Sequence, residues 1–326
     1  LLEKTVVRTL TLADCIIENN SGLFRTVDAY IPNGQIGTIT IDRSIFRNNY
    51  SSGGAFYCFS DTTTTVNVFN SLFENNTAAD VQGSGQAGSS IWLKSGSLRS
   101  ITLNVHNSTF VNNKDLGTTT GFNNFNRTTI VLEKTISPGG TPSGTSANIY
   151  NSIFYDNTTS GGNTAKLISG GITTAPGTNI FNTIDEDGFS QINAANVTNG
   201  ISADPLFVNA ANGNYKLIAG SPAIDAGDNT YVNGTLDVLR SQRIFNTTVD
   251  MGAHEYTTAI ILAPQVYLQG ALLSGGTLMN DALRIGNNIP TTAPYADAAT
   301  CNATVFTATG NNAIVDWIWV ELRDAA

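Results

Sequence analysis

A short phrase that recurs along the chain with substitutions is the feature that most constrains the fold. The copies read DCIIENN at 14–20, RSIFRNN at 43–49, NSLFENN at 70–76, NSTFVNN at 107–113 and NSIFYDN at 151–157, with a decayed copy, FNTIDEDG, at 181–188. The second residues of the five clear copies are separated by 29, 27, 37 and 44 residues. Such elastic repetition is typical of a β-solenoid, in which extra residues leave each coil as surface loops.

The residues around each phrase predict three short strands in every coil. Before the phrase, apolar and polar residues alternate, as in TITI at 38–41, which is the pattern of a half-buried strand. The phrase itself supplies a second strand, and GGAFYCF at 53–59 and GSSIWL at 88–93 supply a third. Coils of three strands form a parallel β-helix, so we expect an all-β fold.

Two sets of repeat residues are expected to stack from coil to coil. Asn tolerates the left-handed backbone of a tight turn better than most residues, and the Phe of the phrase is expected to point inward. We therefore predict a structural ladder that consists of a corner, Asn70, Asn107, Asn151 and Asn182, and an inward file, Phe46, Phe73, Phe110 and Phe154. The Asn pair that closes the phrase suits a second turn, where amides can hydrogen-bond along the stack.

The repeat and the segment after it resemble secreted bacterial surface proteins. The S-x-F-x-N-N phrase with a following GGAFY resembles coils of right-handed parallel β-helix proteins, including the polymorphic outer-membrane protein repeats. The series DPLFV at 204–208, GNYKL at 213–217, SPAIDAG at 221–227 and VDMGAHEY at 249–256 resembles the terminal module of choice-of-anchor proteins. That family usually has Asp-Leu-Asp-Gly-x-x-Arg before its final strand, whereas 237–243 reads DVLRSQR and lacks the Gly turn.

This resemblance implies a location and a division of the chain. The tail resembles a module of large secreted proteins of Bacteroidetes-type bacteria, which implies an extracellular or cell-surface protein exported by the type IX route. We expect β-helix coils over 1–200, a terminal module that caps them over 201–258, and a small antiparallel β-sandwich-like domain over 259–326. Sequence beyond the last residue, or a neighbouring subunit, would complete that domain. Trp317 and Trp319 are the expected contacts of such a fibre assembly.

Charge and cysteine content exclude several classes of protein. The net charge is −9 and charged residues are 13% of the chain, so the basic footprint of a nucleic-acid-binding protein is missing. No apolar run approaches the length of a membrane span. Three cysteines, Cys15, Cys58 and Cys301, cannot form a disulfide framework. A Cys15–Cys58 bridge between neighbouring coils remains an open alternative.

Two classes of function remain, a binding or scaffolding protein and an enzyme. Tyr57 and Trp92 occupy corresponding positions in successive strands and are candidates for a platform that binds glycans. The enzyme alternative is a polysaccharide lyase, which needs a base beside a charge neutraliser. Its candidates are Lys94, Arg99 and His106. Lys94 and Arg99 flank a Ser/Gly-rich loop and read more simply as ordinary surface charges, so we assign no catalytic residue.

Metal binding has weak support in the sequence. The carboxylates of Asp185, Glu186 and Asp187, and of Asp225, Asp228 and Asp237, lack the spacing of a calcium loop, so turn capping is expected and calcium stays an alternative. We assign no cofactor and no metal ligand. The expected function is a non-catalytic adhesin, stalk or fibre subunit whose partners are glycans, other surface proteins or further copies of the chain.

Overall fold

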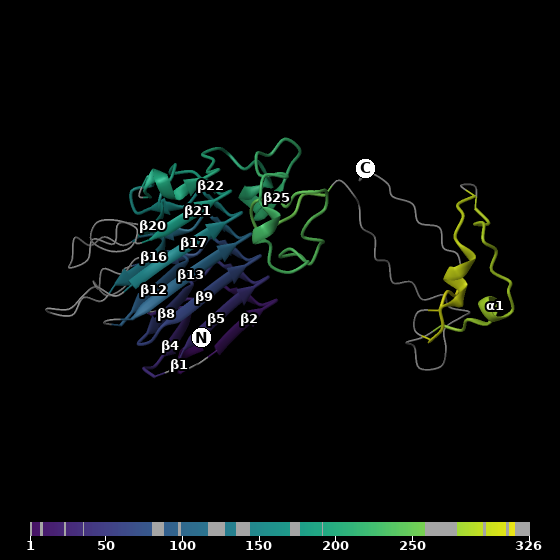
Figure 1. Cartoon of the computed structure of the whole chain (residues 1–326), viewed down its shortest axis with the longest axis horizontal. Helices are drawn as coiled ribbons and strands as arrows, with labels where there is room; N and C mark the ends of the chain where they lie inside the picture. Colours follow the sequence, from purple (N-terminus) through teal and green to yellow (C-terminus); the bar gives the residue numbers. More distant parts are fainter. Residues whose placement is uncertain are drawn as a thin grey trace. The chain divides into compact units, whose positions relative to one another are not determined.

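The structure, a computed structural model, describes most of the chain: residues 2–6, 9–22, 24–34, 36–79, 88–96, 99–116, 128–134, 144–169, 177–190, 192–257, 279–295, 298–310 and 313–316. The chain divides into two compact units, 1–258 and 259–326, which are described separately. In the first unit, equivalent strands of successive coils lie side by side in parallel sheets (Figure 1). This arrangement is an all-β, solenoid-like stack.

The second coil shows how the chain makes one turn of the stack. Its strands are β5 (Gly37–Asp42), β6 (Ile45–Arg47), β7 (Tyr50–Ser51) and β8 (Phe56–Ser60). Left-handed backbone at Arg43 (φ 44°) and Asn48 (φ 55°) turns the chain after β5 and after β6. The prediction of three strands per coil therefore omits one element, because this coil also contains the two-residue strand β7.

Equivalent strands form four parallel sheets among the described residues, named here by their characteristic side chains. The aromatic sheet contains β1 (Leu2–Val6), β4 (Val27–Ile31), β8, β12 (Ile91–Ser95), β16 (Thr128–Lys134) and β20 (Lys166–Ser169). The phenylalanine sheet contains β3 (Ile16–Glu18), β6, β10 (Leu72–Glu74), β14 (Thr109–Val111), β18 (Ile153–Tyr155) and β22 (Ile184–Asp185). The short sheet contains β7, β11 (Thr77–Ala78), β15 (Lys114–Asp115) and β19 (Thr158–Thr159). The threonine sheet contains β2 (Thr9–Ala13), β5, β9 (Thr64–Phe69), β13 (Ser100–His106), β17 (Gly144–Tyr150), β21 (Thr178–Phe181) and β23 (Val197–Thr198).

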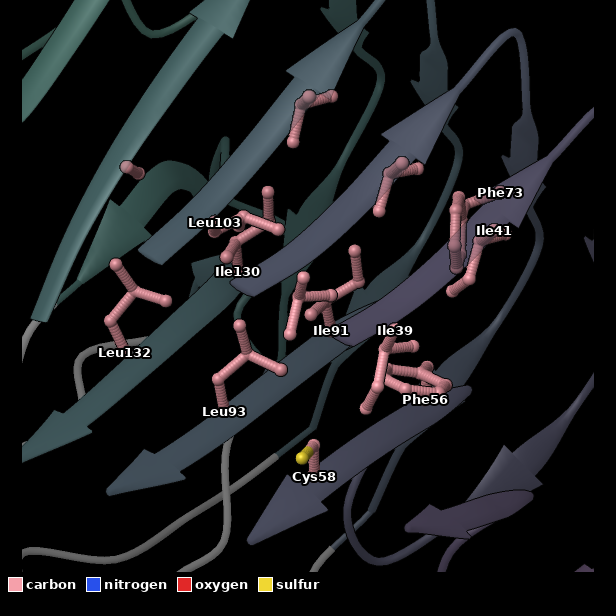
Figure 2. Packing of buried hydrophobic residues seen from close by; sticks show 14 of the residues in the cluster. Ile39, Ile41, Phe56, Cys58, Phe73, Ile91, Leu93, Leu103, Ile130 and Leu132 are labelled. Carbon is pink, nitrogen blue, oxygen red and sulfur yellow. The ribbon is translucent and has the colours of Figure 1, made fainter. Parts of the chain in front are cut away.

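Inward side chains of the sheets fill one core that runs through the stack. Figure 2 shows buried side chains from three of the sheets in this core, among them Ile39 of the threonine sheet, Phe56 of the aromatic sheet and Phe73 of the phenylalanine sheet. Phe46, Phe73, Phe110 and Phe154 pair in register, and their rings stack with centroids 4.6–4.8 Å apart. All four rings are at most 1% exposed. The file places the inward faces of these four phrases in the core.

The first corner of the phrase has a left-handed backbone throughout the stack. The values of φ are 47° at Asn70, 46° at Asn107, 48° at Asn151 and 45° at Asn182. Each of these residues donates its backbone N–H to a carbonyl of the next coil, as Asn107 does to Tyr150 (3.1 Å). Their side chains do not bond to one another; they reach the terminal module, as described below.

A buried ladder of amides runs along the second corner. Here the first residue of each Asn pair has the positive φ, and the second points inward. Nδ2 of each inward Asn donates to Oδ1 of the next one at 2.8–3.0 Å, in the order Asn20, Asn49, Asn76, Asn113 and Asn157. From the second member onward, the same nitrogen also donates to a carbonyl of the previous coil, as Asn113 does to Phe73 (2.9 Å). The side-chain ladder is thus formed by these residues rather than by the first-corner asparagines.

The terminal module, residues 201–257, packs along the side of the stack. It includes the antiparallel pair β24 (Phe207–Asn209) and β25 (Asn214–Leu217) and the 3-10 turns η2 (Ala210–Asn212) and η3 (Asn229–Tyr231). Its apolar residues cover the outer face of the phenylalanine sheet, where Val238 and Ala253 join Leu72 and Val111, and where Met251 joins Ile153 and Ile184. The terminal module therefore forms a lateral strap across several coils.

The described part of the second unit contains short helical turns. These are α1 (Ala282–Ile285) and η4 (Ala303–Thr307), with an isolated antiparallel bridge between Thr292 and Thr300. No strand of the expected sandwich is present within 279–295, 298–310 and 313–316. Trp317 and Trp319 lie outside the described residues.

Candidate functional site

The outer face of the aromatic sheet carries the two residues predicted to bind glycans, Tyr57 and Trp92, and one of the three lyase candidates, Lys94. In-register pairing places Asp28, Tyr57, Trp92 and Val131 in one outward row. A second row, two residues further along each strand, contains Tyr30, Phe59, Lys94 and Glu133. In the sequence, the segments that join β11 to β12, β15 to β16 and β16 to β17 are longer than the corresponding segments of the second coil.

Tyr57 and Trp92 touch each other but do not form an open platform. Their ring centroids are 4.9 Å apart in an edge-on arrangement, and the side chains are only 6% and 4% exposed. The guanidinium of Arg25 lies 3.7 Å from the centroid of Tyr57 and 5.2 Å from that of Trp92. Burial raises the pKa of the Tyr57 hydroxyl. A sugar could not stack on either ring in this conformation.

Glu133 of the second row is bonded to one residue of each row. Trp92 Nε1 donates to its Oε2 (3.0 Å), and Lys94 Nζ lies 2.7 Å from its Oε1. Glu133 is 5% exposed, so the Lys94 ammonium and the indole N–H compensate the charge of a buried carboxylate. Beside them Tyr30 and Phe59 stack in parallel at 5.7 Å. Lys94 is therefore committed to an ion pair, which argues against its use as a free base.

The three lyase candidates do not converge. Lys94 lies in β12 of the aromatic sheet. Arg99 lies after that strand and donates to Oδ1 of Asn33 (2.8 Å), which follows β4. His106 lies at the other end of β13, about 20 Å further along an extended strand. Its Nδ1 is 2.7 Å from the Tyr231 carbonyl, and its ring packs against Phe69 and Tyr150. Burial lowers the pKa of His106, so its ring is a neutral packing group that donates to that carbonyl.

The carboxylates considered for calcium accept bonds from nearby backbone groups. Asp185 accepts from the Phe189 N–H (2.7 Å), and burial raises the pKa of its carboxyl to about 7. Asp237 accepts from the N–H groups of Leu239 and Ser241, and Asp228 accepts from that of Thr230. Within the described part of the chain, no group of three or more His, Cys, Asp or Glu residues is placed to hold a metal ion.

A fully buried ion pair organises the strap. Arg243 is 1% exposed, and its Nη2 lies 3.1 Å from Glu255 Oε2. Glu255 also accepts from the N–H groups of Phe245 (3.0 Å) and Asp250 (3.1 Å). Burial raises the pKa of Glu255 to about 7 and the Arg243 charge opposes that rise. The pair fixes the loop that packs on the phenylalanine sheet.

The first-corner asparagines attach the strap to the coils. Each donates through Nδ2 to a strap carbonyl at 2.8–3.2 Å: Asn70 to Asn233, Asn107 to Asp250, Asn151 to Asp228 and Asn182 to Ala226. Arg240 of the strap also lies 3.3 Å from Asp14 of the first coil. This role could not be predicted from the repeat, because these contacts join residues up to 163 positions apart without a periodic signal.

The cysteines are free thiols in the described structure. Cys58 points into the core from the aromatic sheet, and burial raises its pKa to about 12. Cys15 precedes the phenylalanine sheet and stands where later copies have a serine; its N–H donates to Ser44 Oγ (3.2 Å). The alternative of a Cys15–Cys58 bridge is therefore wrong, since the two residues belong to different walls of the coil.

Comparisons with protein-family models, with curated proteins and with solved structures find no match. Among the helices of the described residues, none is long and apolar enough to cross a membrane.

Proposed function

We propose that the chain is a non-catalytic extracellular protein that serves as a rigid stalk or adhesin segment. The observation that carries the proposal is the unbroken coil-to-coil bonding of the stack: the Phe file, the buried amide ladder and the strap each join successive coils. A solenoid whose coils contact only their neighbours gains stiffness from such repeated contacts. Low charge and abundant Asn, Thr and Ser suit a long surface exposed to solvent.

Several finer features belong to this proposal. We propose that the coils wind right-handed, because about 98% of parallel crossover connections do. Export by the type IX route, a sandwich-like tail, calcium as an optional ligand, and fibre assembly through Trp317 and Trp319 follow from the sequence resemblance and the strand pattern. Surface proteins or glycans are the proposed partners, but the buried rings of Tyr57 and Trp92 favour a glycan contact elsewhere.

Catalysis is tested with the purified chain and a panel of uronate polysaccharides. We expect no release of unsaturated oligosaccharides, because Lys94 is paired and His106 lies on another wall. The matched variant is Lys94→Ala, which should release no product either, although the loss of the ammonium beside the buried Glu133 should lower its stability. Release of unsaturated products by the parent and its loss in Lys94→Ala would establish the lyase alternative.

The stalk itself is tested by pulling the chain from its two ends. Coils of 27–44 residues should unfold one or a few at a time, with length gains of about 90–150 Å per coil. Protease treatment of intact source cells should release peptides of the chain if it is displayed outside. A single unfolding event at low force, or complete protection of the chain in intact cells, would contradict the proposal.

A further inference from the structure

The outer face of the threonine sheet carries a two-column array of small uncharged polar side chains. These residues alternate with the inward core residues of β2, β5, β9, β13, β17 and β21. The first column is Thr9, Thr38, Thr65, Thr102 and Ser146. The second column is Thr11, Thr40, Asn67, Asn104, Asn148 and Asn179. Every residue in both columns is Thr, Ser or Asn. These side chains point away from the core, so the packing of the core does not explain why they are so uniform.

The array is regular in two dimensions. All pairings along these columns are parallel and in register, without a bulge. Neighbouring members of a column are therefore about 4.8 Å apart, and the two columns are about 6.7 Å apart. Thr9 and Thr11 are exposed and the remaining members are half-buried. Partial burial is expected, because each of these side chains has a side chain of similar size beside it on the neighbouring strands.

Hydrogen bonds hold the amides of the array in place. Asn104 donates to Asn67 (2.9 Å), Asn148 to Asn104 (3.1 Å) and Asn179 to Asn148 (3.0 Å), always from Nδ2 to Oδ1. The hydroxyls of Thr102 and Ser146 are 3.2 Å apart. Each amide keeps a second N–H and a second lone pair for a ligand. Because these side chains are already ordered, a ligand does not have to immobilise them.

The strap defines one border of the array. The next outward column contains Phe69, His106, Tyr150 and Phe181, and Tyr231 of the strap stacks on Tyr150 with a centroid distance of 4.0 Å. The strap thus occupies that aromatic column, while the two polar columns stay accessible. The array is therefore a bounded surface with its own chemistry.

We propose that this array binds ice, a lattice of water molecules, which is a function beyond the proposed stalk. A ligand that uses the same group at every coil must itself repeat, and ice presents donors and acceptors on a regular surface. Hydroxyls and amides both donate and accept, as water does, and no charge in the two columns holds a competing hydration shell. A folded protein partner would present side chains of varied size and charge and would gain little from this uniformity.

The test is inhibition of ice recrystallisation by the full chain, with two lysine variants. Thr65→Lys places a long charged side chain in the middle of the first column. It should raise the concentration needed for inhibition at least about tenfold. Thr164→Lys makes the same change at an exposed position between β19 and β20, where Thr164 forms an isolated bridge with Thr158, and should leave inhibition unchanged. Thermal melting establishes that both variants fold.

Further arms distinguish the competing outcomes. Thr102→Val is nearly isosteric and removes one hydroxyl, so it should reduce inhibition in the same direction even if Thr65→Lys fails to fold. The proposal is overturned if the parent chain leaves ice crystals unaffected, or if Thr65→Lys folds and inhibits as well as the parent. Binding to crystalline cellulose or chitin without an effect on ice would also overturn it. Self-association abolished by Thr65→Lys, without ice binding, would show instead that the face is an interface between copies.

Discussion

At the scale of single residues, asparagine performs different tasks at the two corners of the phrase. At the first corner it supplies a left-handed backbone and an amide that reaches the strap. At the second corner the left-handed residue comes first, and the following Asn points into the stack. The repeat predicts both turns, but four of its five clear copies give no clue to which amide of the pair is buried. Only the Asp156-Asn157 copy distinguishes the two positions, because a buried ladder needs an amide.

Asn113→Ala should destabilise the protein strongly. Its side chain joins the Phe73 carbonyl, Asn157 Oδ1 and two nitrogens of Asn76 inside the stack. Removing it leaves buried groups without partners, so we expect a loss of about 3 kcal/mol or more in the free energy of unfolding. Asn104→Ala, on the half-buried outer ladder, should cost about 1 kcal/mol because water can replace the amide. Equal denaturation midpoints for the two variants would contradict the assignment.

Asp185 should make stability fall as the pH rises. Burial raises the pKa of its carboxyl from 3.8 to about 7. Between those values the folded protein holds a proton that the unfolded chain has released, so the free energy of unfolding decreases from about pH 4 to about pH 7. Asp185→Asn removes this titration and keeps an acceptor for the Phe189 N–H. Denaturation at several pH values should show a flatter profile for the variant; parallel profiles would rule out this source of pH dependence.

At the scale of elements, the strands were easier to predict than the way the strap packs. Alternation over residues such as 38–41 identifies β5, and the same alternation marks β9, β13 and β17. Two-residue strands such as β7 have too few residues to show a period. The strap has a recognisable motif series, yet its position depends on contacts such as that of the Ala253 N–H with Thr109 Oγ1. No local pattern encodes a contact over 144 residues.

Arg243→Ala should loosen the strap and leave the coils intact. The substitution leaves Glu255 buried without its cation, a loss that costs about 3–5 kcal/mol in comparable sites. Hydrogen exchange should therefore accelerate across 225–256 while the strands of the aromatic sheet keep their protection. Arg240→Ala is the control, because Arg240 is 66% exposed and its pair with Asp14 should contribute at most about 1 kcal/mol. Faster exchange throughout the stack would show that strap and coils unfold as one unit.

At the scale of the whole molecule, the chain consists of a solenoid unit with its strap and a smaller second unit. The repeat identifies the solenoid because equivalent positions of successive coils pack in the same way and therefore carry similar residues. The tail has no repeat and no long periodic strand among its described residues, so its sequence offered little to predict from. Its expected sandwich depended on one alternating segment at 315–324.

Limited proteolysis should separate the two units. Because the contact division lies between Thr258 and Ala259, we expect early cleavage within 257–263 and a resistant fragment that contains the solenoid and the strap. Mass spectrometry of the resistant fragment identifies its C-terminus. A fragment that lacks the strap, or early cleavage inside the coils, would contradict this division.

The register of the coils is the central claim, and engineered disulfides test it most directly. In a background with the native cysteines replaced by Ser, Thr65→Cys and Thr102→Cys place thiols on directly paired residues of β9 and β13. Their Cα atoms should be about 4.8 Å apart, within the range of a disulfide, so mild oxidation should link them. Thr65→Cys with Asn104→Cys is the diagonal control, about 8 Å apart, and should remain reduced. Efficient linkage of the diagonal pair, with none of the direct pair, would show that the coils are stacked in another register and that the ladders described above do not form.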